Sequence, residues 1–306
     1  MPDILKIATR KSPLAIWQAE EVQRHLQKTG TETELVRMST RGDEILNQPL
    51  AKIGGKGLFI KELERGMLGG LADMAAHSMK DLPSVFPDGL HLGAIMKREN
   101  PTDAFVSNQY DNLDNLPEGA VVGTCSLRRR CQLLARYPHL KIEDLRGNVN
   151  TRLAKLDSGQ FDAIILASAG LIRLELADRI KSQIDTDIML PACAQGAVGV
   201  ECKIDDERTN SLLVSLHDED TAARINCERS LNAKLGGSCQ TPIAAFAELK
   251  ADTLHLRALI GTPDGTHVLK ADGSDHRSRA VELGDAIGQE LLEAGAQKII
   301  DDLALS

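Results

Sequence analysis

The sequence predicts an α/β protein with more than one domain, followed by a small α+β domain at its C-terminal end. Strand-like and helix-like segments alternate through the first two thirds of the chain, a pattern typical of sheets covered by helices. After residue 219 one helix precedes three successive strand-like runs, which indicates an antiparallel sheet. The chain has 306 residues, of which 42% are hydrophobic, so it is long enough for two or three cores.

The first region opens with a strand over 4–9 and a helix that runs from Pro13 towards Gly30. Ser12 stands directly before this helix, and serine followed by proline is a typical helix start. Alternating or apolar runs predict strands over 33–39 and 73–78, with a helix over 57–68 between them.

The second region repeats this layout. Strands are expected over 120–125, 140–145 and 161–167, and helices after Ser126 and over 149–159. A strand, a short polar turn, a helix and a further strand predict a parallel sheet with helices on both faces. The segment 196–204 then returns as one more strand.

The C-terminal region has a different order. A helix over 221–237 ends at Gly236, strands follow over 243–249, 253–261 and 266–271, and a last helix begins near residue 277. Cys239 falls in the loop between the first helix and the first strand, in the run KLGGSCQTP. Glycine and proline at this density predict a bent, accessible loop, which is an unusual place for a cysteine kept only for packing.

Charge limits the partners of the protein. The net charge of −8 argues against general nucleic-acid binding, and only 3% of residues are aromatic, which leaves few platforms for stacking bases. Residues 121–155 nevertheless carry eight Lys/Arg against two Asp/Glu, which predicts that a small polyanion binds in a cleft. The sequence has no apolar run of membrane-spanning length and no recognisable signal peptide, so we expect a cytoplasmic protein without a membrane partner.

Three polar turns follow strands at the places where parallel sheets bind ligands: TRKS (9–12), HSMKD (77–81) and TCSLRR (124–129). Ser12 and Ser126 are either plain helix caps or caps that also present N–H groups to an anion. Arginine suits carboxylates because its donors form a planar fork. The arginines at successive strand ends are therefore candidates for anion binding, with solvated surface charges as the alternative: Arg10, Arg128, Arg129, Arg146, Arg152 and Arg173.

Two further segments have competing interpretations. The glycine-rich run 50–62 lacks the order of a P-loop, so a mobile lid or anion-binding loop with Lys52 and Lys56 is favoured over nucleotide binding. Asp81 is either a turn aspartate or a carboxylate that lies among cations and stabilises positive charge formed in a reaction. No metal is expected at His77, because the four-residue spacing to Asp73 and Asp81 falls on a strand.

The sequence has six cysteines but no CxxC pair, so a zinc site is not expected. Apart from Cys239, we expect the cysteines to be reduced, buried, small hydrophobic side chains. A cysteine-dependent hydrolase would need a histidine base, and no recognisable motif supplies one. A binding protein without catalysis is a second alternative.

Eight segments, taken in order, give the chain a resemblance that covers essentially its whole length. They are IATRKSPLA, IGGKGLFIKELE, AAHSMKDLP, VVGTCSLRRR, LRGNVNTRL, DAIILASAGLIRL, PACAQGAVGVEC and GGSCQTPIAAFAEL. On these segments the chain resembles the porphobilinogen deaminase (hydroxymethylbilane synthase) family of tetrapyrrole biosynthesis. Ser238 and Cys125 depart from the residues that we expect for this family, glycine and serine.

The resemblance implies a reaction and a cofactor. Four porphobilinogen molecules are condensed head to tail with loss of ammonia, and hydroxymethylbilane is released. A dipyrromethane primer is attached to the loop cysteine, here Cys239, through a thioether, and Asp81 is the catalytic carboxylate. Cofactor-binding residues by this match are Ser78, Lys80, Asp81, Thr124, Ser126, Arg128, Arg129 and Arg146. Substrate-binding residues are Arg10, Ser12, Lys52, Lys56, Arg152, Arg173 and, at the interdomain cleft, Gln195.

The resemblance also implies a domain organisation. Two α/β domains like those of periplasmic binding proteins, joined by a hinge, precede a small C-terminal α+β domain with an antiparallel sheet. The expected boundaries are 1–98 with 197–215, then 99–196, then 219–306. We expect a monomer whose partner is the small molecule porphobilinogen.

Overall fold

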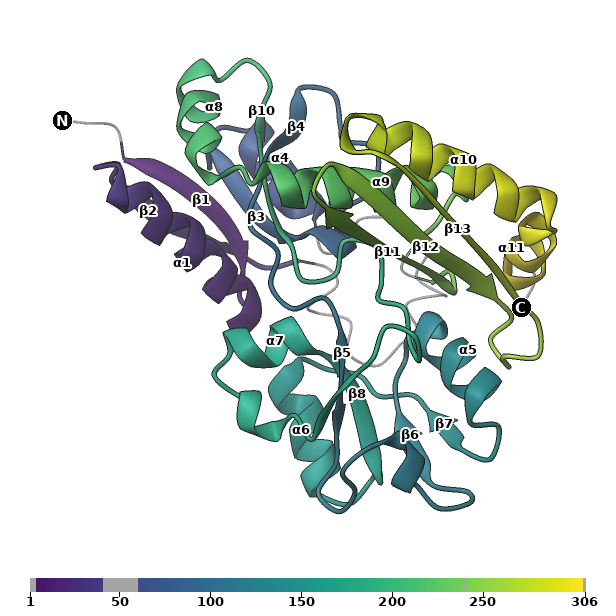
Figure 1. Cartoon of the computed structure of the whole chain (residues 1–306). Coiled ribbons are helices and arrows are strands. Elements are labelled where there is room, and N and C mark those ends of the chain that lie inside the picture. The colour runs from purple at the N-terminus through teal and green to yellow at the C-terminus, as the bar shows by residue number, and fades with distance from the viewer. Residues whose placement is uncertain (1–3, 41–59, 239, 305–306) are drawn as a thin grey trace. The chain divides into compact units, whose positions relative to one another are not determined.

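The computed structural model describes residues 4–40, 60–238 and 240–304 (Figure 1). The chain forms two compact units, Met1–Glu99 with Ala197–Ala222, and Asn100–Gly196 with Ala223–Ser306. The second unit contains two of the three domains expected from the sequence, so the three-domain division stays a prediction.

Unit 1 is built on a five-stranded sheet in the order β2-β1-β3-β10-β4. Its strands are β1 (Leu5–Arg10), β2 (Thr33–Met38), β3 (Met74–Ser78), β4 (Leu90–Ile95) and β10 (Val198–Lys203). Its helices are α1 (Pro13–Lys28), α4 (Lys61–Leu68) and α8 (Glu207–Leu213). Leu26 of α1 packs with Ile7, whereas Leu63 of α4 packs with the next residue, Ala8. Because successive strand residues face opposite sides, α1 and α4 cover opposite faces of the sheet, as predicted.

The second unit begins with a sheet of the same design, in the order β7-β6-β8-β5-β9. Its strands are β5 (Asp103–Val106), β6 (Val121–Gly123), β7 (Lys141–Glu143), β8 (Ala163–Ala167) and β9 (Ser182–Ile184). Its helices are α5 (Leu127–Arg136), α6 (Val149–Asp157) and α7 (Ser168–Arg173). Leu133 of α5 packs with Ile165, and Leu153 of α6 packs with Ile164, so these helices also lie on opposite faces.

The prediction that these sheets are parallel holds for β1, β2 and β3 and for β6, β7 and β8, and it is wrong for two strands. β10 runs antiparallel to β3 and β4, and β5 runs antiparallel to β8 and β9. Each of these two strands is the first one after the chain passes from one unit to the other. A strand that enters from another unit is not joined to its neighbours by a helical crossover, so the rule that makes βαβ strands parallel does not apply to it.

The C-terminal part of the second unit is an antiparallel three-stranded sheet, as predicted. α9 (Glu219–Lys234) leads into strands β11 (Ile243–Lys250), β12 (Thr253–Gly261) and β13 (Val268–His276), and α10 (Ala280–Glu293) and α11 (Ala296–Ala304) follow. Leu231 of α9 and Leu291 of α10 pack with Leu254 and Leu256 of β12. The chain thus has two sheets covered by helices and a smaller α+β part, which confirms the fold class predicted from the sequence.

The turn between β12 and β13 lies against α5. Gly265 in this turn has φ +72°, and a Cβ atom there would come within 2.4 Å of the backbone nitrogen of Ala135. Only glycine fits both the backbone angle and this approach. The small C-terminal sheet is thereby packed on the helix that begins with the arginine-rich segment.

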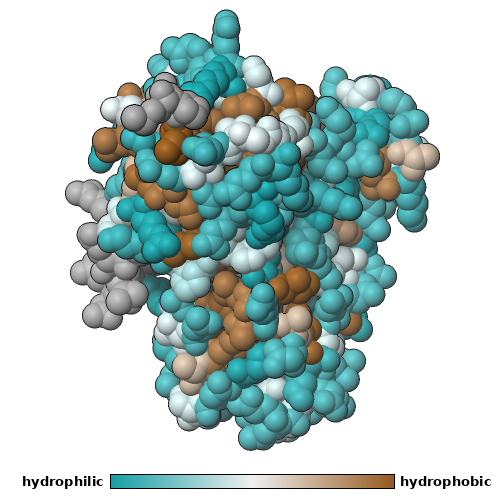
Figure 2. All heavy atoms as spheres, turned by 90° about the vertical axis from the view of Figure 1, so that its left-hand side faces the viewer, coloured by the Kyte–Doolittle hydropathy of each residue, from teal (hydrophilic) through white to brown (hydrophobic). Residues whose placement is uncertain are grey.

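Hydrophilic residues cover much of the face drawn in Figure 2, with hydrophobic residues gathered in patches between them. Within the described ranges 4–40, 60–238 and 240–304, the helices all fall short of the length and apolar character that a membrane span needs.

Candidate functional site

The site residues expected from the sequence fall into two groups within the described ranges, one in each unit. Unit 1 carries Arg10, Ser12, Ser78, Lys80 and Asp81. β1 and β3 are parallel neighbours, with Ile7 opposite Met74 and Ala8 opposite Ala75. Since both strands end at the same edge of the sheet, the turns that follow them are brought to one place, as a ligand site in such a sheet requires.

Hydrogen bonds fix the two turns of unit 1. Ser12 caps α1 by accepting from the Ala15 amide at 3.4 Å, which confirms the predicted cap. Gln18 of α1 donates to the hydroxyl oxygen of Ser78 at 2.7 Å, and so ties the helix to the end of β3. Asp81 ends a single 3₁₀ turn, Met79–Asp81, and is half-buried. The carboxylate is therefore held at the sheet edge by a short turn and is accessible to a ligand.

Three titratable side chains are buried behind this turn. His77 on β3, Glu201 on β10 and Glu64 on α4 are 6%, 0% and 8% exposed. His77 Nε2 lies 3.0 Å from Glu201 Oε2. Burial raises the pKa of Glu64, and the charge of Glu201 raises it further. Among the described residues, no group of three or more His, Cys, Asp or Glu has the arrangement of a metal site.

Replacing Glu64 should reveal this buried charge. A carboxyl group with a raised pKa is destabilising once pH rises above its ordinary value of 4.5, because ionisation is resisted in the folded state. Glu64→Gln should therefore raise the free energy of unfolding at pH 7 by ~1 kcal/mol, a size typical of one substitution. The gain should shrink as pH falls towards 4.5 and below, where the wild-type carboxyl is also neutral in both states. Urea unfolding at several pH values measures this.

Glu20→Gln, at an exposed position on α1, is the matched control and should give a small difference at all pH values. A destabilised Glu64→Gln protein at pH 7 would instead mean that the ionised carboxylate holds the buried trio together.

The second group surrounds the start of α5. Ser126 caps this helix by accepting from the Arg129 amide at 3.4 Å, again as predicted. The hydroxyl oxygen of Thr124 accepts from the Ser126 amide at 3.2 Å, and the Thr124 amide donates to the Glu143 carbonyl at 2.9 Å. The turn is thus tied to the parallel strand β7 beside it, and Arg128 and Arg129 lie in the first helical turn.

Asp103 at the start of β5 is the centre of this group. It accepts from Arg128 Nη1 at 2.7 Å and from Arg129 Nη2 and Nε at 2.7 and 3.0 Å. All three side chains are buried, and Asp103 is fully so. Burial alone would raise the pKa of Asp103, but the charges of Arg128 and Arg129 outweigh it, so the pKa lies below its usual range.

The two arginines differ in the donors that they use. All three nitrogens of Arg129 are used, since Nη1 donates to the Ile165 carbonyl at 2.8 Å in addition to the bonds with Asp103. Within the described residues, the hydrogen bonds of the Arg128 side chain all come from Nη1, which also donates to the Leu190 carbonyl at 2.7 Å. To the described residues, Arg128 thus donates through one nitrogen, whereas Arg129 donates through all three and two of those reach Asp103.

The remaining expected residues lie on neighbouring segments. Gln195 is 1% exposed, and its Nε2 donates to Asp103 Oδ1 at 3.0 Å. Arg173 at the end of α7 is 8% exposed and donates to the Gly196 carbonyl at 2.7 Å. Arg146 and Arg152 are half-buried, and Arg146 lies 3.5 Å from Asp144. Gln195 and the two arginines thus share Asp103 as a hydrogen-bond partner. Asp103 was not among the site residues expected from the sequence.

Cys239, Lys52 and Lys56 lie outside the described residues. The other five cysteines are free thiols. The prediction that all five are buried is wrong for Cys125, which is exposed in the turn before Ser126, and for Cys193, which is half-buried. Burial raises the pKa of Cys131 to about 11 and that of Cys202 and Cys227 to about 12. These three are poor nucleophiles at neutral pH, because the thiolate is the reactive form.

One cysteine has neighbours of the kind found in cysteine hydrolases. Cys202 lies 3.4 Å from His91 Nε2, and Asn210 Oδ1 lies 2.7 Å from the same nitrogen. A catalytic histidine needs one ring nitrogen for the thiol and the other for the residue that orients it. The shared nitrogen, full burial and raised pKa of Cys202 make this a packing contact and disfavour the hydrolase alternative at this position.

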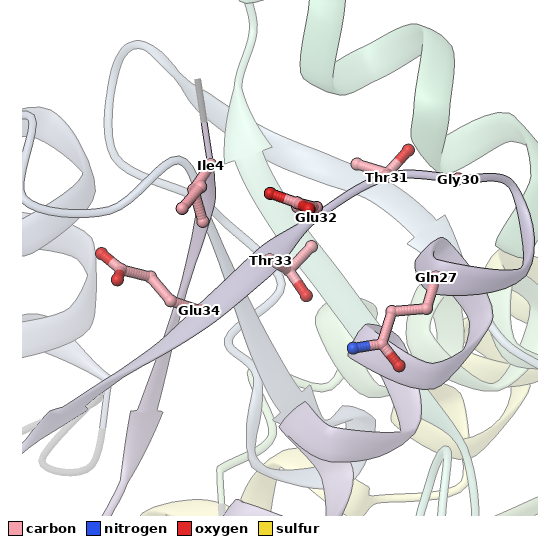
Figure 3. Close-up of a pocket in the computed structure, with 7 residues that line it drawn as sticks. All are labelled: Ile4, Gln27, Gly30, Thr31, Glu32, Thr33 and Glu34. Carbon is pink, nitrogen blue, oxygen red and sulfur yellow. The ribbon is translucent and has the colours of Figure 1, made fainter. Parts of the chain in front are cut away.

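Figure 3 shows a pocket where β1 and β2 begin, at the end of these strands opposite to the turns that carry Ser12 and Asp81. It is lined by Ile4, Gln27, Gly30, Thr31, Glu32, Thr33 and Glu34. These seven residues include two carboxylates and no cation, so the pocket does not suit an anionic ligand. It also lies away from the strand ends at which ligands of parallel strands bind.

Comparisons with known proteins match almost the whole chain. The family model described as "Porphobilinogen deaminase, dipyromethane cofactor binding domain" matches residues 5–211, and "Porphobilinogen deaminase, C-terminal domain" matches residues 222–293. The chain belongs to the porphobilinogen deaminase family. It is therefore an enzyme of tetrapyrrole biosynthesis with a dipyrromethane cofactor, as the sequence resemblance implied.

Three of the solved structures that are similar to this member of the family have low sequence identity to it. They are the BvgS periplasmic VFT2 domain of Bordetella pertussis (20% identity, 70% of this chain and 86% of that chain, TM-score 0.42), a nutrient-binding protein of Burkholderia cenocepacia bound to methionine (12%, 69%, 90% and 0.44) and the methionine-binding protein MetQ (15%, 72%, 93% and 0.46).

The residues around Asp103 fit the cofactor of the porphobilinogen deaminase family. Two buried arginines and one buried aspartate leave one positive charge in excess. An uncompensated buried charge is costly, so an anion of the bound molecule would complete the cluster. A dipyrromethane with carboxylate side chains supplies such an anion, and Arg128 would hold it.

Proposed function

We propose that this enzyme deaminates porphobilinogen and joins four such units head to tail on a dipyrromethane primer bound to Cys239, with release of hydroxymethylbilane and ammonia. The observation that carries the proposal is the excess of buried positive charge at Arg128, Arg129 and Asp103 in a protein whose net charge is −8. Porphobilinogen and the growing chain carry two carboxylates on each pyrrole, which such a cluster suits.

The residues of unit 2 bind and orient in this proposal. Arg128 binds a carboxylate, and the N-terminus of α5 capped by Ser126 favours negative charge beside it. Thr124, Arg146, Arg152, Arg173 and Gln195 extend the polar lining. When bound, the primer supplies a nucleophilic pyrrole carbon, and the thioether from Cys239 keeps it in place through successive turnovers.

The residues of unit 1 act on charge. Asp81 lies half-buried at the end of β3, beside Ser78 and Lys80 and at the same sheet edge as Arg10 and Ser12. Its carboxylate holds pyrrole N–H groups and stabilises the positive charge that develops as ammonia leaves the substrate. Lys80 and Arg10 bind substrate carboxylates.

The intact mass of the purified protein tests the proposal. An excess over the sequence mass equal to two pyrrole units, together with ammonia release from porphobilinogen, is expected. A binding protein without catalysis and a cysteine hydrolase would both lack this covalent excess. That the enzyme is a cytoplasmic monomer stays a prediction, which cell fractionation and sedimentation measure.

Arg128→Leu should be isolated largely as apoprotein. Loss of one charged donor to a buried carboxylate costs roughly 2–5 kcal/mol, which is enough to impair assembly of the primer. The mass excess should fall accordingly. Arg136→Leu, an exposed arginine two turns later on α5, is the control and should retain the full excess. Full primer content and an unchanged KM in Arg128→Leu would show that Arg128 serves only Asp103.

A further inference from the structure

A buried glutamate on α9 joins two backbone segments of the second unit. Glu228 is 0% exposed. Its Oε2 accepts from the Ala194 amide at 2.6 Å, and its Oε1 accepts from the Ala247 amide of β11 at 2.9 Å. Each carboxylate oxygen thus has a backbone donor. The first of these bonds reaches the loop that carries Gln195.

The backbone of this loop is strained at the residue that Glu228 holds. Ala194 has φ +63°, a left-handed conformation that residues other than glycine seldom adopt. It is 1% exposed, so it is packed as well as bonded. A non-glycine residue keeps this conformation only when its surroundings impose it, and the bond to Glu228 is such a constraint.

The next residue extends the contact to the anion site. Gln195 Nε2 donates to the Pro101 carbonyl at 2.8 Å and to Asp103 Oδ1 at 3.0 Å. Asp103 Oδ1 is the same oxygen that accepts from Nε and Nη2 of Arg129. A continuous chain of contacts therefore runs from Glu228 through Ala194 and Gln195 to Asp103.

We propose that Glu228 is a positioning residue for the carboxylate-binding arginines. It holds Ala194 in the left-handed conformation, which aims Gln195 at Asp103 and fixes the two guanidinium groups before a ligand arrives. This role rests on the proposed function of the arginine site. The helix that carries Glu228 ends at Lys234, five positions before Cys239 in the sequence. The same helix therefore carries the positioning residue and leads towards the cysteine proposed to bind the primer.

The competing role of Glu228 is purely structural, through its bond to Ala247. Substitution of Ala194 separates the two. Glycine adopts φ +63° without the steric cost of a Cβ atom, so residue 194 would keep this conformation with less help from the bond to Glu228. The Ala194→Gly substitution does not alter the bond between Glu228 and Ala247. Glu228→Gln turns an amide NH₂ towards one of the two backbone donors, and so loses one of the two bonds.

The first experiment compares steady-state kinetics of Glu228→Gln, Ala194→Gly and the double variant, on preparations with confirmed primer mass. Glu228→Gln should raise KM for porphobilinogen about tenfold, the loss of a bond to a charged group, with a smaller effect on kcat. The double variant should recover most of the KM. Glu219→Gln, at a position with an 85% exposed side chain at the start of α9, is the matched control.

The second experiment does not depend on turnover. In protein labelled with ¹⁵N-arginine, the Nε–H resonance of Arg129, assigned by its loss in Arg129→Lys, reports the bond to Asp103. Glu228→Gln should shift this resonance, and Ala194→Gly in the double variant should restore it. Gln195→Leu should produce a similar shift while leaving both bonds of Glu228 in place, and it serves if Glu228→Gln does not fold.

The outcomes distinguish this proposal from the proposed function. An unshifted Arg129 resonance in both Glu228→Gln and Gln195→Leu would overturn the positioning role, as would a double variant no better than Glu228→Gln in KM and resonance. If the wild-type protein has no primer and releases no ammonia, the deaminase reaction is refuted. The positioning role would still hold if the variants show the expected shifts of the Arg129 resonance and the double variant restores it.

Discussion

Cys239→Ser should give a folded protein with no covalent pyrroles and turnover close to background. The thiolate is a strong nucleophile towards an electron-poor carbon, whereas a serine hydroxyl remains protonated and weak at neutral pH. The substitution exchanges one sulfur atom for oxygen, so the sheets and the arginine cluster should be unaffected. Intact mass and the rate of ammonia release from porphobilinogen, measured on the same preparation, test this expectation.

Cys125→Ser is the informative control for the thiol. Cys125 is exposed in the turn before Ser126, so it is the described cysteine with the best access to a ligand of this turn. It should retain the full mass excess. If Cys239→Ser kept the added mass and Cys125→Ser lost it, the primer would be attached to the turn before α5 instead of the C-terminal loop.

Much of the order of strands and helices was predictable because its signals are local, but the strands β4, β5 and β9 were missed. Serine before proline or leucine, with an apolar periodicity behind it, marks the start of α1 and of α5, and both caps form the expected bonds. The direction of β5 and β10 was not predictable in this way. It depends on how the chain passes between units, which periodicity within a segment does not encode.

The candidate site was predictable by residue type but not by partner. Arg128, Arg129 and Arg130 are consecutive in the sequence, yet the first two are buried against Asp103 and the third is half-buried. Asp103 lies 25 residues before Arg128, and its only local signal is a charge in front of a short apolar run. Glu228 and Gln195 are likewise joined through space, because the burial that makes their contacts strong arises only after the segments pack.

The position of Asp81 indicates what a substitution of its side chain should change. It ends the turn Met79–Asp81, whose first amide donates to the Ala197 carbonyl at 3.0 Å and whose Met79 carbonyl accepts from the Leu82 amide at 3.3 Å. These backbone bonds do not use the Asp81 side chain. A substitution that keeps the shape of the side chain should therefore leave the turn in place and change mainly the charge.

Asp81→Asn should retain the fold, the primer and much of the substrate binding, while turnover falls by roughly 10²-fold or more, the size of losing one preorganised electrostatic group. A carboxylate stabilises the cation formed as ammonia departs more than it stabilises neutral porphobilinogen, which is the condition for lowering a barrier. Asp81→Glu keeps the charge but displaces it by one methylene, so it should retain more activity than Asn.

Asp88→Asn, at an exposed position in the same unit, should be as active as wild type. Rates must be measured on preparations of equal primer mass, because assembly of the primer uses the same chemistry. An Asp81→Asn protein with full primer and wild-type turnover would make Asp81 a turn residue only.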